Sequence, residues 1–154
     1  MKIKPSVLEL AKFLHLVATL KEVERKPPRG IAVGRPDSVA DHCFLLAWLA
    51  WFFASRRGGL KEERIIKMAL VHDLAKISLG EKDPLLFTGG RKRTSELVHR
   101  WPRLSQAEKN KLMLQRTRLE ARKVETIASF LDPSLRDEVL SLWQEAEWGR
   151  SPEA

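Results

Sequence analysis

The segment Lys67–Lys76, KMALVHDLAK, places a histidine and an aspartate side by side at the end of an apolar run that favours a helix. Imidazole and carboxylate groups both bind divalent metal ions. Burying such an adjacent pair within an apolar element is costly unless the pair has a partner. We therefore predict that the chain packs around this segment in a way that gives His72 and Asp73 a partner.

A second histidine, His42, ends the motif SVADH, where a polar turn runs into a strongly apolar segment. If the two segments lie together, His42, His72 and Asp73 converge on one metal ion. A lone histidine beside a lone aspartate is more often a surface or hydrogen-bonded residue. The spacing by itself leaves both interpretations open.

Apolar residues recur at intervals of three and four along most of the chain, and no segment alternates with the period of a strand. Capping signals support three helix starts: S-x-x-[DE] at Ser38 and at Ser105, and Asp132 followed by proline. The pattern predicts an all-α fold with helices at 5–24, 39–57, 60–77, 106–131 and 133–148.

The helix at 39–57 contains the longest apolar run, from Cys43 to Ala54. This run is shorter than the roughly 20 residues that span a bilayer. We predict that it is a buried helix, with Phe44 to Phe53 in the core and His42 pointing out of the core from the first turn. Cys43, the single cysteine, excludes an internal disulfide, and a buried inert thiol fits a cytoplasmic location.

Composition limits the class of protein. A chain of 154 residues that is 44% apolar is long enough to bury one core. The N-terminus lacks the basic start, apolar middle and cleavage site of a secretory signal. The 28 Lys and Arg against 20 Asp and Glu give a net charge of +8, which attracts phosphorylated molecules. We interpret this excess as a solvated surface in preference to a nucleic-acid face.

Two basic segments separate the predicted helices. Residues 25–37, RKPPRGIAVGRPD, contain three prolines and two glycines, which predict a loop. Residues 85–103 include FTGGRKRTSELVHRWPR and predict an irregular segment with a short helix at 95–100. The second segment is open to interpretation as a lid, a partner surface or a solvated loop.

The strings PDSVADH and ERIIKMALVHDLAK, separated by an apolar helix, closely resemble the HD-domain phosphohydrolases. Within that family they are most similar to the 5'-deoxynucleotidases, which remove phosphate from nucleoside monophosphates. The similarity runs from LKEVER near Leu20 to SLRDEVLSLWQEAEWGRSPEA. The resemblance implies a single HD domain over residues 1–154, built as a helical bundle of about five to seven helices.

The resemblance implies that His42, His72 and Asp73 bind one divalent ion, with manganese, cobalt, zinc and magnesium all open. It further implies that Arg25 holds the substrate phosphate and that Glu81 lies near the sugar. Guanidinium suits the phosphate because it donates in a bidentate fork.

Two positions depart from the family pattern. The family's glutamate that helps activate the attacking water is replaced by Lys76, which is protonated near neutral pH and would bind phosphate instead. The family's fourth metal ligand is an aspartate on a later helix, and we expect this chain to end before that helix. Asp132 and Asp137 are the aspartates nearest to that region.

Two functions follow from the resemblance. The first is a metal-dependent phosphohydrolase acting on nucleoside 5'-monophosphates, deoxyribonucleotides favoured, or similar phosphate monoesters, with Asp73 and Lys76 in the catalytic site. The alternative is a catalytically impaired HD-fold protein that binds a nucleotide or nucleic acid in a regulatory role. The resemblance also implies a homodimer and a small phosphorylated substrate. The short apolar run predicts no membrane association, and the charge balance makes nucleic acid the less favoured partner.

Overall fold

The computed structural model describes residues 6–25, 37–79 and 101–154. Within these ranges the chain forms α-helices and short 3-10 helices, and the only β-pairing is an isolated bridge. The all-α prediction is confirmed. The predicted short helix at 95–100 lies outside the described residues, as does most of each basic segment.

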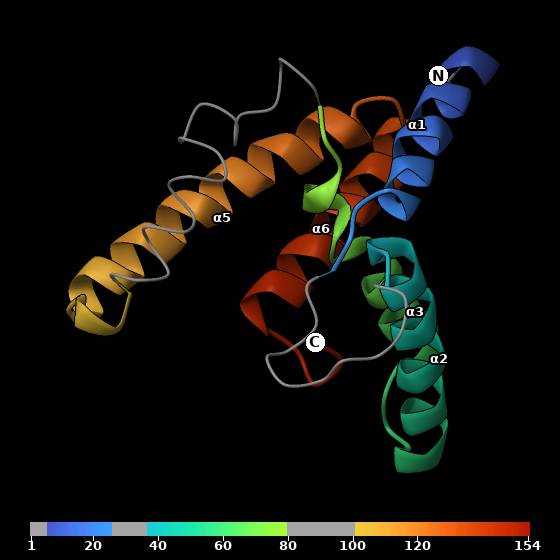
Figure 1. Ribbon diagram of the computed structural model, residues 1–154. Helices are drawn as coiled ribbons and strands as arrows, with labels where there is room; N and C mark the ends of the chain where they lie inside the picture. Colours follow the sequence, from blue (N-terminus) through green and yellow to red (C-terminus); the bar gives the residue numbers. More distant parts are fainter. Residues whose placement is uncertain (1–5, 26–36, 80–100) are drawn as a thin grey trace. The chain divides into compact units, whose positions relative to one another are not determined.

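The chain divides into two compact units, residues 1–77 with 127–154, and residues 78–126. The first unit contains α1 (Val7–Ala18), α2 (Val39–Arg57), α3 (Glu62–Val71) and α6 (Pro133–Trp148) (Figure 1). Most of α5 (Gln106–Ala128) belongs to the second unit.

The three capping signals mark the starts of α2, α5 and α6. The hydroxyl of Ser38 accepts from the N–H of Asp41 at 3.1 Å, and the Asp41 carboxylate accepts from the N–H of Ser38 at 3.0 Å. Ser105 and Glu108 form the same reciprocal pair at α5, and Asp132 caps α6. The predicted first helix begins later than Pro5, at Val7, because Ser6 and Glu9 make a further capping box.

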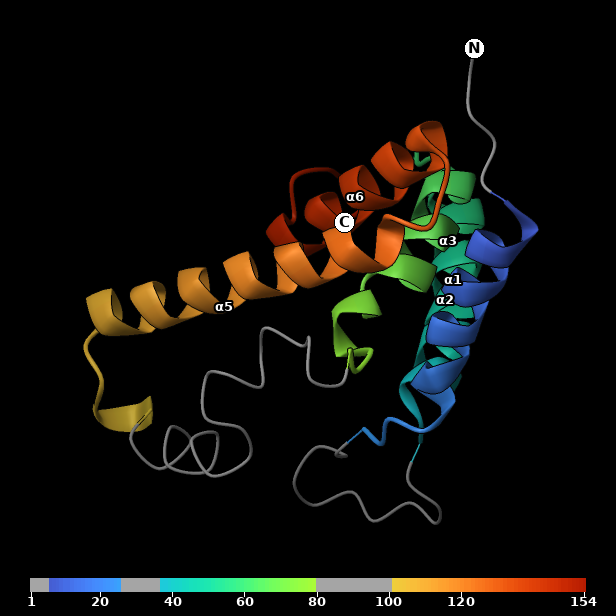
Figure 2. The ribbon, with the colours of Figure 1, turned by 90° about the horizontal axis from the view of Figure 1, so that it is seen from above.

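Helix α3 lies at the centre of the first unit. It packs against α2 on one side and against α6 on the other (Figures 1 and 2). The core between these helices consists of Ala54, Ile65, Met68 and Leu142, with Ala50, Leu60, Val71 and Ala146 packed around it. The segment that ends in His72 and Asp73 is therefore rigidly held, as its apolar circumference predicts.

Helix α2 is buried on a narrower face than predicted. Its buried residues are Val39, Cys43 and Ala54, and its large apolar side chains from Phe44 to Phe53 are mostly exposed. The prediction that Phe44 to Phe53 are buried was wrong. The physical reason is that small residues of α2 face α3, so the two helices pack through Ala50 and Ala54, while the bulky residues lie on the opposite side.

Ion pairs join α3 to α6 at the surface of this core. The Arg64 guanidinium donates to both oxygens of the Glu145 carboxylate, which also accepts from the Ser151 hydroxyl. Hydrogen bonds from Arg64 and Ser151 lower the pKa of Glu145 to about 2. Lys67 of α3 contacts Glu138 of α6 at 2.7 Å.

We predict that Glu145→Gln lowers the free energy of unfolding by about 1–2 kcal/mol at pH 7, a value reduced for solvent screening. The folded-state pKa lies below the usual 4.5, so the stabilisation is present above pH 4.5 and is lost as the pH falls toward 2. Urea unfolding at a series of pH values measures this. Asp137→Asn, an exposed carboxylate on the same helix, serves as the control and should change stability little. A Glu145→Gln effect equal to that of the control would contradict the prediction.

Candidate metal centre

Helix α3 ends at Val71, one residue before His72, and this ending shapes the site. The Nδ1 of His72 donates to the carbonyl of Ala69 at 2.8 Å. In a continuous helix that carbonyl would accept from the N–H of Asp73. The imidazole bond therefore competes with the next helical turn, and Asp73 adopts φ −99°, ψ 13°.

The prediction of one helix over 60–77 was wrong in this detail. A short 3-10 helix, Leu74–Lys76, follows the break. On an ideal helix His72 and Asp73 would point about 100° apart. In the structure their side chains converge, with His72 Nε2 at 3.4 Å from Asp73 Oδ2. Because Nδ1 is engaged by Ala69, Nε2 is the ring nitrogen available as a ligand.

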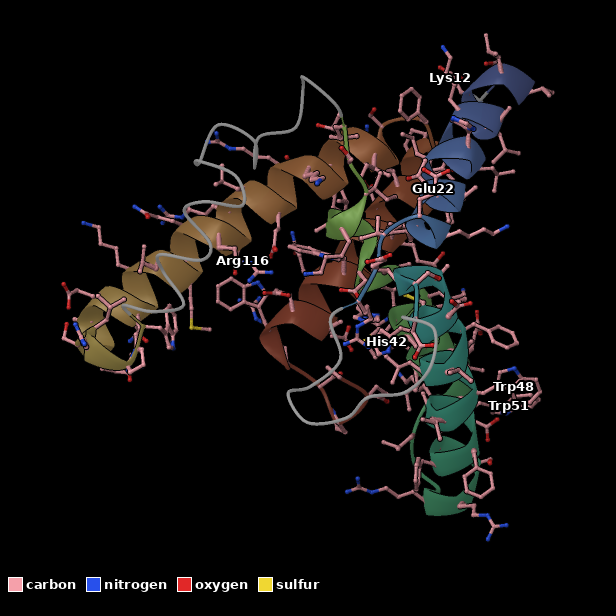
Figure 3. All side chains as sticks on the ribbon, in the orientation of Figure 1. Lys12, Glu22, His42, Trp48, Trp51 and Arg116 are labelled. Carbon is pink, nitrogen blue, oxygen red and sulfur yellow. The ribbon has the colours of Figure 1, made fainter. Side chains whose placement is uncertain are left out.

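His42 joins this pair from the first turn of α2. Its ring centroid lies 5.3 Å from that of His72, with an interplanar angle of 74°. The ligand atoms of His42, His72 and Asp73 all lie within 4.8 Å of one another. Figure 3 shows His42 at the N-terminal end of α2, on the opposite side of the helix from Trp48 and Trp51. The structure thus brings together the three residues that the sequence singled out.

The pKa values of the two histidines are shifted in opposite directions. Burial, reinforced by the Arg25 charge, lowers the pKa of His42. Burial acts in the same direction on His72, but the hydrogen bond and charge of Asp73 outweigh it and raise the pKa of His72. Burial raises the pKa of Asp73 less than contact with His72 lowers it, so the net shift is downward. The downward shifts of the His42 and Asp73 pKa values favour the neutral imidazole and the ionised carboxylate, the forms in which these two groups bind a metal ion.

An isolated antiparallel bridge between Glu24 and Ser38 places Arg25 beside the site. The N–H of Arg25 donates to the carbonyl of Asp37 at 2.8 Å, and the N–H of Val39 donates to that of Val23 at 2.8 Å. The Arg25 charge acts on the pKa values of both histidines. No strand-period pattern marks these few residues, so sequence analysis did not predict the bridge.

Lys76 ends the 3-10 helix that follows Asp73. Its N–H donates to the carbonyl of Asp73 at 2.9 Å, and its side chain is exposed. The Lys76 charge contributes to the lowered pKa of Asp73. A cation therefore stands one short turn from the proposed metal ligands. Glu81 lies outside the described residues.

The donor set fits a divalent ion. Two imidazoles and one carboxylate, half-buried and with one ring oriented by a backbone carbonyl, are typical of sites that keep positions open for water or substrate. Within residues 6–25, 37–79 and 101–154, no fourth His, Cys, Asp or Glu joins this group. Asp132 instead caps α6, and Asp137 is exposed beside Arg136.

A family model described as HD domain matches residues 17–154, which include every residue of this group. The chain belongs to the HD-domain family. The resemblance of the two sequence blocks is thereby confirmed.

Relatives named 5'-deoxynucleotidase HDDC2, from Danio rerio and Homo sapiens, are each 31% identical to this HD-domain chain over 145 residues. These residues are 94% of this chain but only 60% and 59% of the two relatives, so the chain spans about three fifths of their length.

A solved structure described as a predicted metal-dependent phosphohydrolase from Magnetospirillum magnetotacticum MS-1 aligns with a TM-score of 0.62 at 19% identity. The alignment covers 96% of this chain and 62% of that chain. At this identity the likeness shows the fold, which agrees with the predicted HD-domain bundle.

Cys43, next to His42 in α2, is buried as predicted. Burial raises the pKa of its thiol to about 11, so the thiol is uncharged near neutral pH, as an inert thiol should be. None of the helices in the described ranges combines the length and apolar character that a bilayer crossing requires.

Proposed function

We propose that this chain is a metal-dependent phosphohydrolase that removes phosphate from nucleoside 5'-monophosphates, with deoxyribonucleotides favoured, or from similar phosphate monoesters. The observation that carries the proposal is the convergence of His42, His72 and Asp73 within 4.8 Å in an HD-domain chain. The names of the curated relatives support the nucleotide substrate.

In this proposal His42, His72 and Asp73 hold the divalent ion, which is manganese, cobalt, zinc or magnesium. When bound, such an ion lowers the pKa of a coordinated water and offsets charge on the phosphoryl oxygens. His72 presents Nε2 because Ala69 holds Nδ1, and Asp73 supplies the negative charge of the set.

Arg25 and Lys76 provide the positive charge for the substrate phosphate. The Arg25 charge acts to lower the pKa values of both histidines, and the Lys76 charge acts to lower the pKa of Asp73. The forked guanidinium of Arg25 suits two phosphate oxygens, and the Lys76 ammonium acts as a single point charge. We assign Glu81 to the substrate sugar on the family resemblance alone.

We predict that His72→Ala weakens manganese binding by roughly 100-fold or more, because it removes one of three protein ligands. Isothermal titration calorimetry on the apoprotein measures this directly and needs no turnover. His15→Ala is the matched control, since His15 lies on the exposed side of α1 and should leave affinity unchanged. Equal manganese affinity in the two variants would remove His72 from the proposed site.

We predict metal-dependent phosphate release from deoxynucleoside monophosphates that exceeds release from ribonucleoside monophosphates. Asp73→Ala should reduce the rate to background, because it removes the charged ligand of the set. A colorimetric phosphate assay over both substrate panels, with each of the four metals added, measures the rate. Turnover that survives Asp73→Ala would contradict the assignment of this site.

The exposed lysine beside Asp73 favours the alternative, a catalytically impaired HD-fold module that binds a nucleotide or nucleic acid without hydrolysing it. A lysine cannot accept the proton of an attacking water near neutral pH unless strongly desolvated. In that case nucleotides bind without turnover. Nucleic-acid binding would show itself by a steep loss of affinity with salt.

Substitution of Lys76 distinguishes the phosphohydrolase from the catalytically impaired module. If Lys76 binds phosphate, Lys76→Gln should lower kcat/KM by about 10-fold or more, the value of a charge-assisted hydrogen bond, and Lys76→Glu should lower it further by repulsion. Steady-state kinetics on the preferred monophosphate measures both. A gain of activity in Lys76→Glu would contradict the phosphate role and favour the impaired module.

We also propose that the protein works as a homodimer in the cytoplasm. The family resemblance supports the dimer, and the buried, uncharged Cys43 thiol suits a reducing compartment.

A further inference from the structure

Ser38 contacts both the segment that carries Arg25 and the helical turn that carries His42. Its backbone pairs with Glu24 in the isolated bridge, one residue before Arg25. Its carbonyl accepts from the N–H of His42 at 3.1 Å. Its dihedral angles, φ −78° and ψ 163°, are those of an extended residue at the N-cap of a helix. The bridge and α2 therefore meet at this one residue.

The side chain of Ser38 holds the turn that precedes His42. Its hydroxyl accepts from the N–H of Asp41 at 3.1 Å and donates to Asp41 Oδ2 at 2.8 Å. The same Asp41 oxygen accepts from the N–H of Ser38 at 3.0 Å. Since His42 directly follows Asp41, these hydrogen bonds fix the backbone from which the imidazole extends.

This capping box is less exposed than the other two boxes of the described residues. The bonds between Ser38 and Asp41 are partly buried, whereas the boxes at Ser6 on α1 and at Ser105 on α5 are exposed. Hydrogen bonds shielded from water hold their geometry more strictly, because breaking them leaves polar atoms without a ready replacement partner. The box at the start of α2 is thus the one best suited to fix a side chain in place.

The backbone on both sides of Ser38 is tied to the segment that carries Arg25. The N–H of Arg25 donates to the carbonyl of Asp37 at 2.8 Å, and the N–H of Val39 donates to the carbonyl of Val23 at 2.8 Å. Val39 is 2% exposed, which anchors this end of the bridge in the core. Because one bond lies on each side of Ser38, the two segments cannot slide along each other without breaking a bond.

We infer that Ser38 is a positioning residue, which holds His42 and Arg25 in one fixed arrangement. Its side chain acts on His42 through the capping box, and its backbone acts on Arg25 through the bridge. The inference rests on the proposed function, since it concerns a proposed metal ligand and a proposed phosphate-binding residue. Phosphate hydrolysis needs the phosphate held at a fixed distance from the metal ligands, so a displacement of either group weakens binding and slows the reaction.

The alternative is that Ser38 stabilises the start of α2 and does nothing else. Removal of its hydroxyl would then lower the free energy of unfolding, as removal of any N-cap does, and would leave ligand binding by the folded protein unchanged. Loss of a positioning residue alters the ligand affinity of the folded protein as well. The tests therefore measure affinity and not stability.

The first test measures manganese affinity by isothermal titration calorimetry on the apoprotein. Ser38→Ala removes the cap and lets the first turn of α2 fray. We expect manganese binding to weaken about 5-fold, the size of effect that the loss of one N-cap has on helix formation. Ser38→Thr keeps a hydroxyl at the same position and should restore the affinity to within about 2-fold.

Ser6→Ala and Ser105→Ala are the matched controls, because each removes the same kind of capping box from a helix that carries none of the three proposed ligands. Both should bind manganese as the unmodified protein does. A Ser38→Ala affinity equal to that of the controls would overturn the role of the Ser38 side chain. A Ser38→Thr affinity no higher than that of Ser38→Ala would do the same.

The second test breaks the bridge and keeps the cap. Val39→Pro deletes the N–H that donates to Val23, and proline suits this place because Val39 is the first residue of α2 and Ser38 already has the extended conformation required before proline. Val39→Ala keeps the N–H and loses more of the side chain. Calorimetry on protein loaded with one equivalent of manganese should show orthophosphate binding about 5-fold weaker in Val39→Pro than in Val39→Ala.

The outcomes separate this inference from the proposed function. Equal orthophosphate affinity in Val39→Pro and Val39→Ala would overturn the role of the bridge. An unmodified protein that binds no manganese would overturn the proposed function and the role of Ser38 together. If the unmodified protein binds manganese and the Ser38 and Val39 variants bind no more weakly than their controls, only the role of Ser38 is overturned.

Discussion

The hydrogen bond from His72 Nδ1 to the carbonyl of Ala69 is the interaction on which the candidate metal centre depends. It takes up a carbonyl that would otherwise continue α3, and the chain breaks at that point into a short 3-10 helix. The break turns Asp73 toward His72, and it leaves the second ring nitrogen of His72 facing the carboxylate. This side-chain hydrogen bond thus lies where the helix ends, leaves Nε2 of His72 as the candidate ligand atom, and accompanies the convergence of two adjacent side chains.

That hydrogen bond fixes the position of His72 because α3 itself is packed between α2 and α6. Its apolar residues pack against α2 and α6, and Arg64 and Lys67 join it to carboxylates of α6. The candidate site therefore sits at the end of a rigid element, with His42 arriving from the first turn of a neighbouring helix. A short backbone bridge adds Arg25 to the same place. Preorganisation of this kind positions ligands before an ion arrives.

Helix α2 packs against α3 through its small residues and exposes its bulky apolar residues on the opposite side. Its small residues allow close packing on α3, and this brings His42 within reach of His72. Its bulky residues, Phe44, Trp48 and Phe52 among them, consequently lie on the opposite side of the helix and are exposed. The convergence of His42 with His72 and the exposure of the aromatic residues both follow from which side of α2 packs against α3.

The sequence by itself determined the helical class, the starts of α2, α5 and α6, and the identity of the three converging residues. Apolar periodicity and capping are local, and the SVADH and VHDLAK motifs carry ligand-type side chains whatever surrounds them. Only the tertiary structure decided where α3 ends, how Arg25 is placed and which face of α2 is buried. A run such as FLLAWLAWFF is apolar on every side, so its sequence contains no signal for the inward face. That choice is made by packing, because small residues let two helices approach closely and large ones on the same side would hold them apart.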